Sequence, residues 1–266
     1  ITLRNMGEQS TPDLMADCAR AAEDAGLESL WITDHIAIPP DDAEGSGGRY
    51  LDILTTLAWL AGVTSSINLG SGVLILPYRS KLPTAKQIAT VQELSQGRLL
   101  LGVGVGWMDA EFKALGIDRK DRGRLTDEML EFLNECFDSD EMELNGQEFL
   151  FKPRPRRPKL LIGGGPPHAL ARAVKYGDGW FPMARSPDEI AASIEEYDAL
   201  CDESGQDRGQ VTALVPFAAS NDVEAKALID SYDRVGVDRV ICAVGYDDLA
   251  EYKASVAKIE RLLNAF

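Results

Sequence analysis

The stretch LGSGVLILPYRSKLPTAKQIATVQELSQGRLLLGVGVGW, residues 69–107, contains two mostly apolar runs with a helix-like segment between them. Residues 67–76 and 99–103 have the near-continuous apolar character of strands that are buried on both faces of a parallel sheet. Residues 83–94 have helical spacing, with a proline in the first turn. The stretch therefore predicts a strand, a covering helix and a second parallel strand.

The same alternation continues outward to both ends of the chain. Strand-like ranges are 1–5, 28–32, 67–76, 99–103, 159–163, 179–182, 211–217 and 239–244, and helix-like ranges are 12–25, 51–63, 83–94, 122–137, 168–176, 187–204, 223–235 and 248–263. Asn145-Gly146 predicts a hairpin turn. We predict an α/β fold: a single (β/α)8 TIM barrel over residues 1–266 as one domain, with a small hairpin insertion before strand five.

Composition excludes several classes of function. The 266 residues carry a formal net charge of −16, so nucleic acid is an unfavourable partner. We find no apolar run of about 20 residues and no signal peptide, and we expect a cytoplasmic protein without a membrane span. The four cysteines lack CxxC spacing, which predicts free thiols and no metal site. The chain begins inside a strand-like range, and we expect a few preceding residues to be missing.

Active sites of such barrels form on the loops that follow the strands. His35 follows the second strand directly, where a histidine can exchange a proton near neutral pH or simply pack in the barrel mouth. Glycines at 70–72 and 102–106 indicate close backbone approach to a ligand or, alternatively, plain packing. Gly163, Gly164 and Gly165 precede a helix, as in a phosphate cradle or a flexible loop. A rim rich in backbone donors and poor in nucleophiles suits a cofactor that supplies the chemistry.

Together these motifs resemble the bacterial luciferase-like monooxygenase family, in the style of its F420-dependent branch. The motifs are LWITDHIAIP at 30–39, residues 69–107 quoted above, EFKALG at 111–116, RGRLTDEMLEFL at 122–133 and AVKYGDGWFP at 173–182. The resemblance implies a (β/α)8 barrel that binds F420 or FMN, and it covers nearly the full length. It also implies a non-proline cis peptide at Gly72–Val73.

Position by position, the resemblance implies a set of cofactor-binding residues on the loops after strands two to six. They are Asp34, His35, Gly72, Val73, Gly104, Val105, Gly106, Gly163, Gly164, Gly165, Asp178, Gly179 and Trp180. His35 is the predicted catalytic residue. The substrate pocket is predicted from Tyr78, Arg79, Trp107 and Phe112, with Arg49 and Tyr50 on a neighbouring loop. That loop, from Pro39 to Arg49, has the glycine content of a lid or, equally, of a disordered surface loop.

Val105 is a departure from the family pattern. The sugar-phosphate dehydrogenases of the family carry an acidic residue there, so its absence argues against a sugar-phosphate substrate and leaves His35 as the main proton donor. Glu111, a few residues further on, is a substitute for that acid or, as we prefer, a solvated charge at a helix start.

The predicted function is hydride transfer between F420 and a small organic substrate. One alternative is an FMN-dependent monooxygenase that receives reduced flavin from a partner reductase, and another is a non-catalytic flavin-binding barrel. We expect a homodimer, with an F420 or flavin reductase as a further partner.

Overall fold

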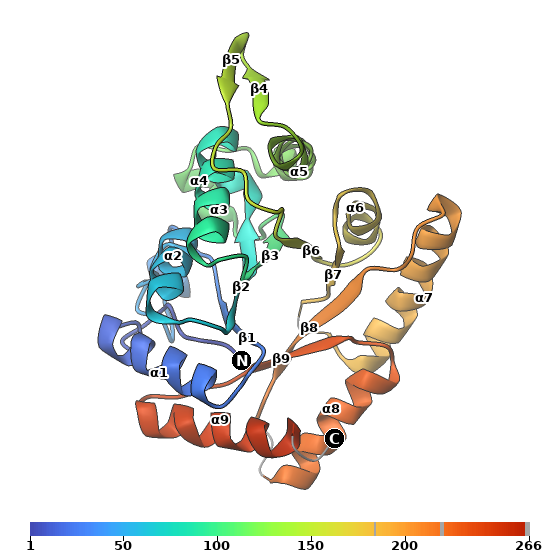
Figure 1. Cartoon of the computed structure of the whole chain (residues 1–266). Coiled ribbons are helices and arrows are strands. Elements are labelled where there is room, and N and C mark those ends of the chain that lie inside the picture. Colours follow the sequence, from blue (N-terminus) through green and yellow to red (C-terminus); the bar gives the residue numbers. More distant parts are fainter. Residues whose placement is uncertain (184, 219–220, 264–266) are drawn as a thin grey trace.

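The computed structural model describes residues 1–183, 185–218 and 221–263. Seven strands form one parallel sheet in the order β1-β2-β3-β6-β7-β8-β9. They are β1 Ser29–Ile32, β2 Asn68–Ile75, β3 Leu99–Gly104, β6 Lys159–Gly163, β7 Gly179–Phe181, β8 Gln210–Pro216 and β9 Arg239–Ala243. The sheet curls into a barrel, which Figure 1 shows end on. The predicted α/β barrel is confirmed.

The first residues of the chain fill the eighth strand position. The Thr2 N–H donates to the Cys242 carbonyl of β9 at 3.0 Å, and the Leu3 N–H donates to Trp31 of β1 at 2.8 Å. The Trp31 N–H donates in return to the Ile1 carbonyl at 2.9 Å. Residues 1–3 thus join β9 to β1, so the backbone ladder closes and leaves neither strand as an open edge.

Helices cover the outside of the barrel (Figure 1). The helices are α1 Pro12–Asp24, α2 Ile53–Val63, α3 Lys81–Leu94, α4 Asp109–Ala114, α5 Arg122–Asp138, α6 His168–Tyr176, α7 Pro187–Ser204, α8 Asp222–Arg234 and α9 Leu249–Leu263, with 3-10 turns at Pro40–Asp42, Leu76–Tyr78 and Arg119–Asp121. Local sequence sets several starts. Thr11 and Asp52 cap α1 and α2, and Ser186 forms a capping box with Glu189 on α7.

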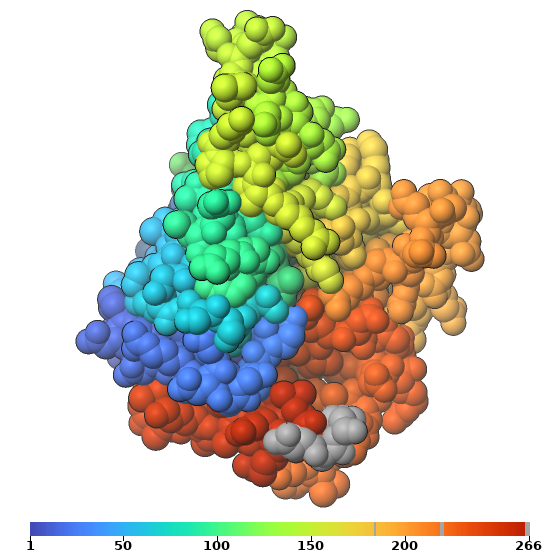
Figure 2. All heavy atoms as spheres, viewed as in Figure 1, coloured from blue at the N-terminus to red at the C-terminus, as the bar shows by residue number. Residues whose placement is uncertain are grey.

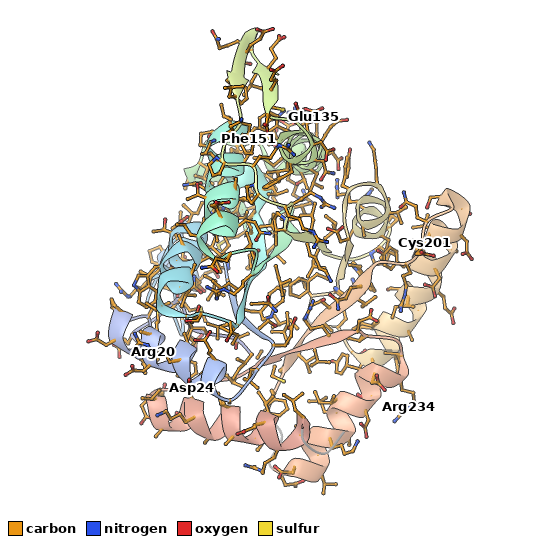
Figure 3. The ribbon with its side chains drawn as sticks, viewed as in Figure 1. Arg20, Asp24, Glu135, Phe151, Cys201 and Arg234 are labelled. Carbon is orange, nitrogen blue, oxygen red and sulfur yellow. The ribbon has the colours of Figure 1, made fainter. Side chains whose placement is uncertain are left out.

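Aromatic and aliphatic side chains pack together in the barrel interior, and Figure 3 shows side chains throughout the body as sticks. Trp31 and Phe181 meet edge to face, with ring centroids 5.6 Å apart. A Cβ atom at Gly70 would lie 2.2 Å from the Trp31 indole, closer than any real contact. Glycine in β2 therefore makes room for a tryptophan from the neighbouring strand β1, which is a packing role.

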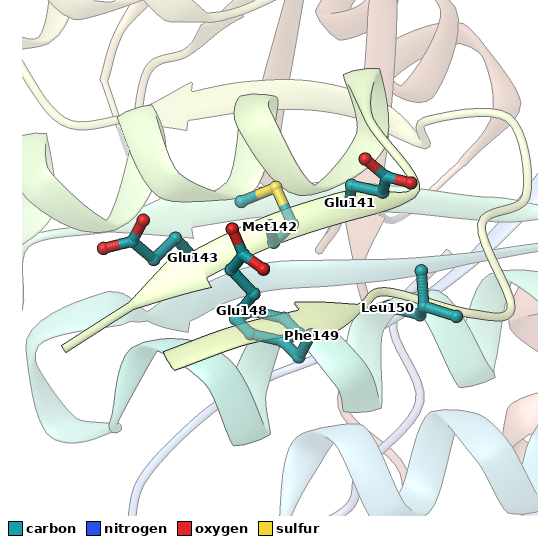
Figure 4. Close-up of a pocket in the computed structure, with 6 residues that line it drawn as sticks. All are labelled: Glu141, Met142, Glu143, Glu148, Phe149 and Leu150. Carbon is teal, nitrogen blue, oxygen red and sulfur yellow. The ribbon is translucent and has the colours of Figure 1, made fainter. Parts of the chain in front are cut away.

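The predicted hairpin is confirmed as β4 Glu141–Leu144 and β5 Gln147–Leu150. Asn145 and Gly146 have φ of 55° and 76°, as a two-residue primed turn requires. The base of the hairpin is held where Phe151 packs against Phe137, and the tip of the hairpin projects from the body (Figures 2 and 3). A hollow of about 480 Å³ on the hairpin is lined by hairpin residues alone, three of them glutamates (Figure 4). It lies outside the barrel.

Residues 1–183, 185–218 and 221–263 include no helix long and apolar enough to cross a membrane. The cytoplasmic location stays a prediction. All four cysteines are buried free thiols, as predicted.

Candidate active site

Glu111, in α4, lies under His35 at the carboxyl end of the barrel. Its side chain is 1% exposed, and one carboxylate oxygen lies 3.0 Å from the His35 Nδ1. The same oxygen accepts from the Tyr78 hydroxyl at 3.0 Å. The other oxygen accepts from the backbone N–H groups of Ile36 at 2.5 Å and Ala37 at 3.0 Å. The carboxylate therefore connects α4 with the loops after β1 and β2.

These contacts determine the charge of Glu111. Burial alone would raise the pKa of the Glu111 carboxyl, but hydrogen bonds from His35 and from two backbone N–H groups outweigh burial and lower the pKa to about 2. Our interpretation of Glu111 as a solvated charge is wrong. Phe112 and Leu115, which follow it, pack into the barrel mouth and turn the preceding side chain inward.

Asp34 and Arg79 form a buried ion pair. Arg79 donates through two nitrogens to the two Asp34 oxygens, at 2.6 and 2.8 Å, and the Ile75 N–H adds a third bond at 2.8 Å. Their side chains are 0% and 9% exposed. Charge and hydrogen bonds from Asp34 and Asp52 overcome burial and raise the pKa of Arg79. The pair clamps the end of β2 to the loop after β1, directly beside His35 in sequence.

The four predicted substrate-pocket residues fall into two groups. Tyr78 and Phe112 are buried, with their rings 5.0 Å apart edge to face, and Arg79 is held by Asp34. Trp107 is 65% exposed, and its ring centroid lies 6.2 Å from that of His35. Trp107 alone among the four presents an open surface at the mouth.

The loop before α2 reaches the same mouth. The Tyr50 ring lies 4.9 Å from the His35 ring, centroid to centroid. Arg49 is tied to Ser10 by two hydrogen bonds, at 2.8 and 3.1 Å, so the end of the loop is anchored next to α1. Movement of the loop as a lid stays a prediction.

The expected bulge in β2 is confirmed. The register with β3 shifts between Ser71 and Leu74, and the Gly72–Val73 peptide is cis. Val73 points at two of the predicted cofactor glycines. A Cβ atom would lie 2.7 Å from Val73 at Gly104 and 3.1 Å from it at Gly163. Gly104 leaves room for Val73, whereas at Gly163 the Val103 carbonyl oxygen is nearer still, at 2.8 Å, so packing already requires a glycine at both positions.

The glycine loop after β6 borders a cavity of about 320 Å³. The cavity is lined by Val105, Lys120, Arg122, Gly123, Gly163, Gly164, Gly165, His168, Ala169 and Arg172. Arg172 is paired with Asp127 at 2.6 Å, and the Arg122 guanidinium bonds the Arg119 carbonyl at 3.0 Å. The cavity thus combines the amino end of α6 with four basic side chains in a chain whose net charge is −16.

This set of basic residues was not predicted from the sequence. Lys120, Arg122, His168 and Arg172 come from two separate segments that only folding brings together. A signal existed for two of them. Residues 119–124 hold four basic side chains at the start of the helix predicted over 122–137, and the motif at 122–133 covers part of this segment without assigning it a role.

Asp178, Gly179 and Trp180 lie at the start of β7 and within it, and not on a loop that follows a strand. The Asp178 carboxylate accepts from the Leu160 N–H at 2.8 Å and pairs with Arg157 at 2.8 Å, at the amino end of the strands. Gly179 begins β7. Trp180 is fully buried on the outer side against Tyr197, although its indole donates to the Gly164 carbonyl at 2.7 Å. Trp180 thus holds the glycine loop through the Gly164 carbonyl, from the outer side of the barrel.

The architecture defines a class: a TIM-barrel protein whose loops after the strands carry a histidine–glutamate pair and a glycine-lined cavity with basic side chains. A family model described as luciferase-like monooxygenase matches residues 2–259. The chain therefore belongs to the luciferase-like monooxygenase family, whose members are flavin- or F420-dependent oxidoreductases, and it is an oxidoreductase.

Relatives and solved structures agree with this assignment. The chain is 28% identical over 218 residues to 5,10-methylenetetrahydromethanopterin reductase of Methanolobus tindarius, covering 79% of this chain and 62% of the relative. It is 29% identical over 210 residues to F420-dependent hydroxymycolic acid dehydrogenase of Mycobacterium tuberculosis, covering 75% and 57%. The fold is similar to that of monooxygenase RslO1 from Streptomyces bottropensis, with a TM-score of 0.83, 17% identity and coverage of 100% and 98%.

Proposed function

We propose that this chain binds F420 and transfers a hydride between it and a small organic substrate, with His35 exchanging the accompanying proton. The observation that carries the proposal is the basic glycine cavity, whose lining residue Val105 is two residues before Trp107, the neighbour of His35 at the mouth. The deazaflavin would supply two-electron hydride chemistry when bound.

The donor set of the cavity suits an anionic group. The backbone of Gly163, Gly164 and Gly165 precedes α6, whose amino end carries a partial positive charge. Lys120 is exposed at its border, where it adds positive charge, and the exposed His168 adds a hydrogen-bonding group. The Gly164 N–H already donates to the Phe181 carbonyl at 3.2 Å, so Gly165, Lys120 and Arg122 would hold the cofactor phosphate. Lys120 and Arg122 suit the phosphate of either cofactor, and the resemblance of the sequence motifs to the F420-dependent branch is what favours F420 over FMN.

The M. tuberculosis relative described as F420-dependent supports the same choice. The alternative function, an FMN-dependent monooxygenase, is suggested by the similarity in fold to monooxygenase RslO1. A titration with oxidised F420 and with FMN at matched salt, followed by fluorescence, separates the two. Tighter binding of FMN would overturn the choice of F420.

A charge-reversal variant tests the position of the phosphate. Lys120→Glu should weaken F420 binding on the order of tenfold at low salt, and by less at high salt, since exposed charges are screened. Lys113→Glu, an equally exposed lysine on α4 that does not line the cavity, is the matched control. Equal affinities of the two variants would show that the phosphate binds elsewhere.

The role of His35 is tested by His35→Ala once a substrate is known. Loss of general acid–base catalysis should lower kcat by on the order of 10²–10⁴. Unchanged turnover would remove the proposed role. The homodimer and the reductase partner stay predictions, which sedimentation and a coupled assay with reductase would test.

A further inference from the structure

The four hydrogen bonds to Glu111 restrict where His35 can carry its proton. A carboxylate with a pKa of about 2 is ionised at any working pH, and an ionised carboxylate only accepts hydrogen bonds. The oxygen that lies 3.0 Å from the His35 Nδ1 therefore requires a hydrogen on that nitrogen. In a neutral imidazole one ring nitrogen is protonated and the other is an acceptor. Nε2 is consequently the atom left to gain or lose a proton.

The surroundings of the ring fix its direction. Tyr50 and Trp107 flank the imidazole, with centroids 4.9 and 6.2 Å away. The His35 side chain keeps 19% of its surface exposed, and within the described residues Nε2 has no hydrogen-bond partner. The Nδ1 atom of His35 thus contacts the buried Glu111 carboxylate, and the Nε2 side of the ring faces the barrel mouth.

We propose that Glu111 is a positioning residue: it holds His35 in the Nδ1–H tautomer and so makes Nε2 the atom that exchanges a proton with the substrate. Glu111 does not itself donate a proton, because both of its oxygens already accept hydrogen bonds. The link to catalysis rests on the proposed function, whereas the tautomer is a property of the chain alone.

The other polar groups at the site are compatible with this role. Tyr78 donates to the same Glu111 oxygen as His35, and burial followed by the adjacent Glu111 raises the pKa of its hydroxyl, so Tyr78 stays neutral. Asp34 and Arg79 neutralise each other in their ion pair. Tyr50 contacts His35 through its ring, and Trp107 carries no charge. Glu111 is therefore the charged group that bonds the imidazole.

The tautomer can be measured directly. The chain contains only two histidines, His35 and His168, so ¹⁵N NMR of the imidazoles gives two sets of signals, which a His168→Gln variant assigns. The measurement uses the cofactor-free protein at a pH where the ring is neutral. We expect the Nδ1–H tautomer for His35 in the unmodified chain. A dominant Nε2–H tautomer would overturn the proposal without any variant being needed.

Glu111→Gln should reverse the tautomer. The N–H groups of Ile36 and Ala37 require an acceptor, so the amide oxygen turns toward them and the amide NH₂ toward His35. That NH₂ can only donate, which moves the imidazole proton to Nε2. Tyr78→Phe, which removes another donor to Glu111, is the matched control and should keep the Nδ1–H form. A Gln variant that retains Nδ1–H contradicts the proposal.

Kinetics give a second readout once a substrate is available. A wrong tautomer should lower kcat by on the order of 10²–10⁴ and leave KM nearly unchanged. The Glu111→Gln change should cost no further activity in a His35→Ala background, whereas additive losses would mean that Glu111 acts independently of His35 and would overturn the proposal. Failure of F420 to support turnover would refute the proposed function and leave the NMR result intact.

Discussion

Replacing Asp34 by asparagine should destabilise the fold strongly, because it removes the anion from a buried ion pair. The Asp34 side chain is 0% exposed and the Arg79 side chain 9%. Asparagine keeps one acceptor oxygen, but its NH₂ group then faces an Arg79 N–H or the Ile75 N–H, where two donors meet. Breaking a buried pair from one side costs about 3–5 kcal/mol.

The magnitude should fall near the lower end of that range. Arg79 keeps a second partner in Asp52, at 3.3 Å, although Asp52 is 47% exposed and compensates only in part. We expect a loss of about 3 kcal/mol, which lowers the melting temperature by about 6–12 °C for a chain of this size. Asp17→Asn is the matched control, since the Asp17–Arg20 pair is about half exposed and should change stability by no more than about 0.5 kcal/mol.

Urea unfolding followed by circular dichroism gives the free energy of unfolding for both variants, provided that the slope with denaturant is unchanged. A double variant, Asp34→Asn with Arg79→Met, should recover part of the loss because the unpaired charge is gone. A value for Asp34→Asn that equals the Asp17→Asn control would refute the reasoning. It would also reopen a direct contact with the cofactor as the main role of Asp34.

Three further changes have expected outcomes. Gly70→Ala places a Cβ atom 2.2 Å from the Trp31 indole and should cost about 1–3 kcal/mol by overpacking, or prevent folding, as measured by the urea midpoint. The pKa of Glu111 falls on folding from 4.5 to about 2, so its contribution to stability is full above pH 4.5 and is lost as the pH falls toward 2; Glu111→Gln should flatten this part of the stability profile. Arg122→Ala should weaken F420 binding more at low than at high ionic strength, and an effect independent of salt would argue against a charge contact.

Much of the barrel could be predicted from local pattern. Near-continuous apolar runs such as β3 indicate strands covered on both faces, and Asn145-Gly146 specifies a primed turn on its own. The glycine loop before α6 was likewise predictable, because a turn and a helix start are encoded within a few residues. These features depend on neighbours in sequence, which is the information that a single chain displays directly.

The partners of each site residue were not predictable in the same way. Glu111 meets His35 across 76 residues, and Arg79 meets Asp34 across 45. In sequence, Glu111 has the pattern of a solvated charge, and Arg79 has that of a group free to bind substrate. Their burial follows from how α4 and the turn after β2 pack onto the barrel mouth.

The amino-acid sequence by itself determined the alternation of strands and helices, the hairpin turn and the end of the barrel at which the site lies. Hydrophobic periodicity, turn residues and the order of the elements along the chain can all be read from neighbouring residues. Tertiary structure alone decided which charges are paired and which face the cavity. A carboxylate becomes an anchor for His35, and two distant basic segments become one anion site, only when closure of the barrel excludes water and brings the partners within hydrogen-bond distance.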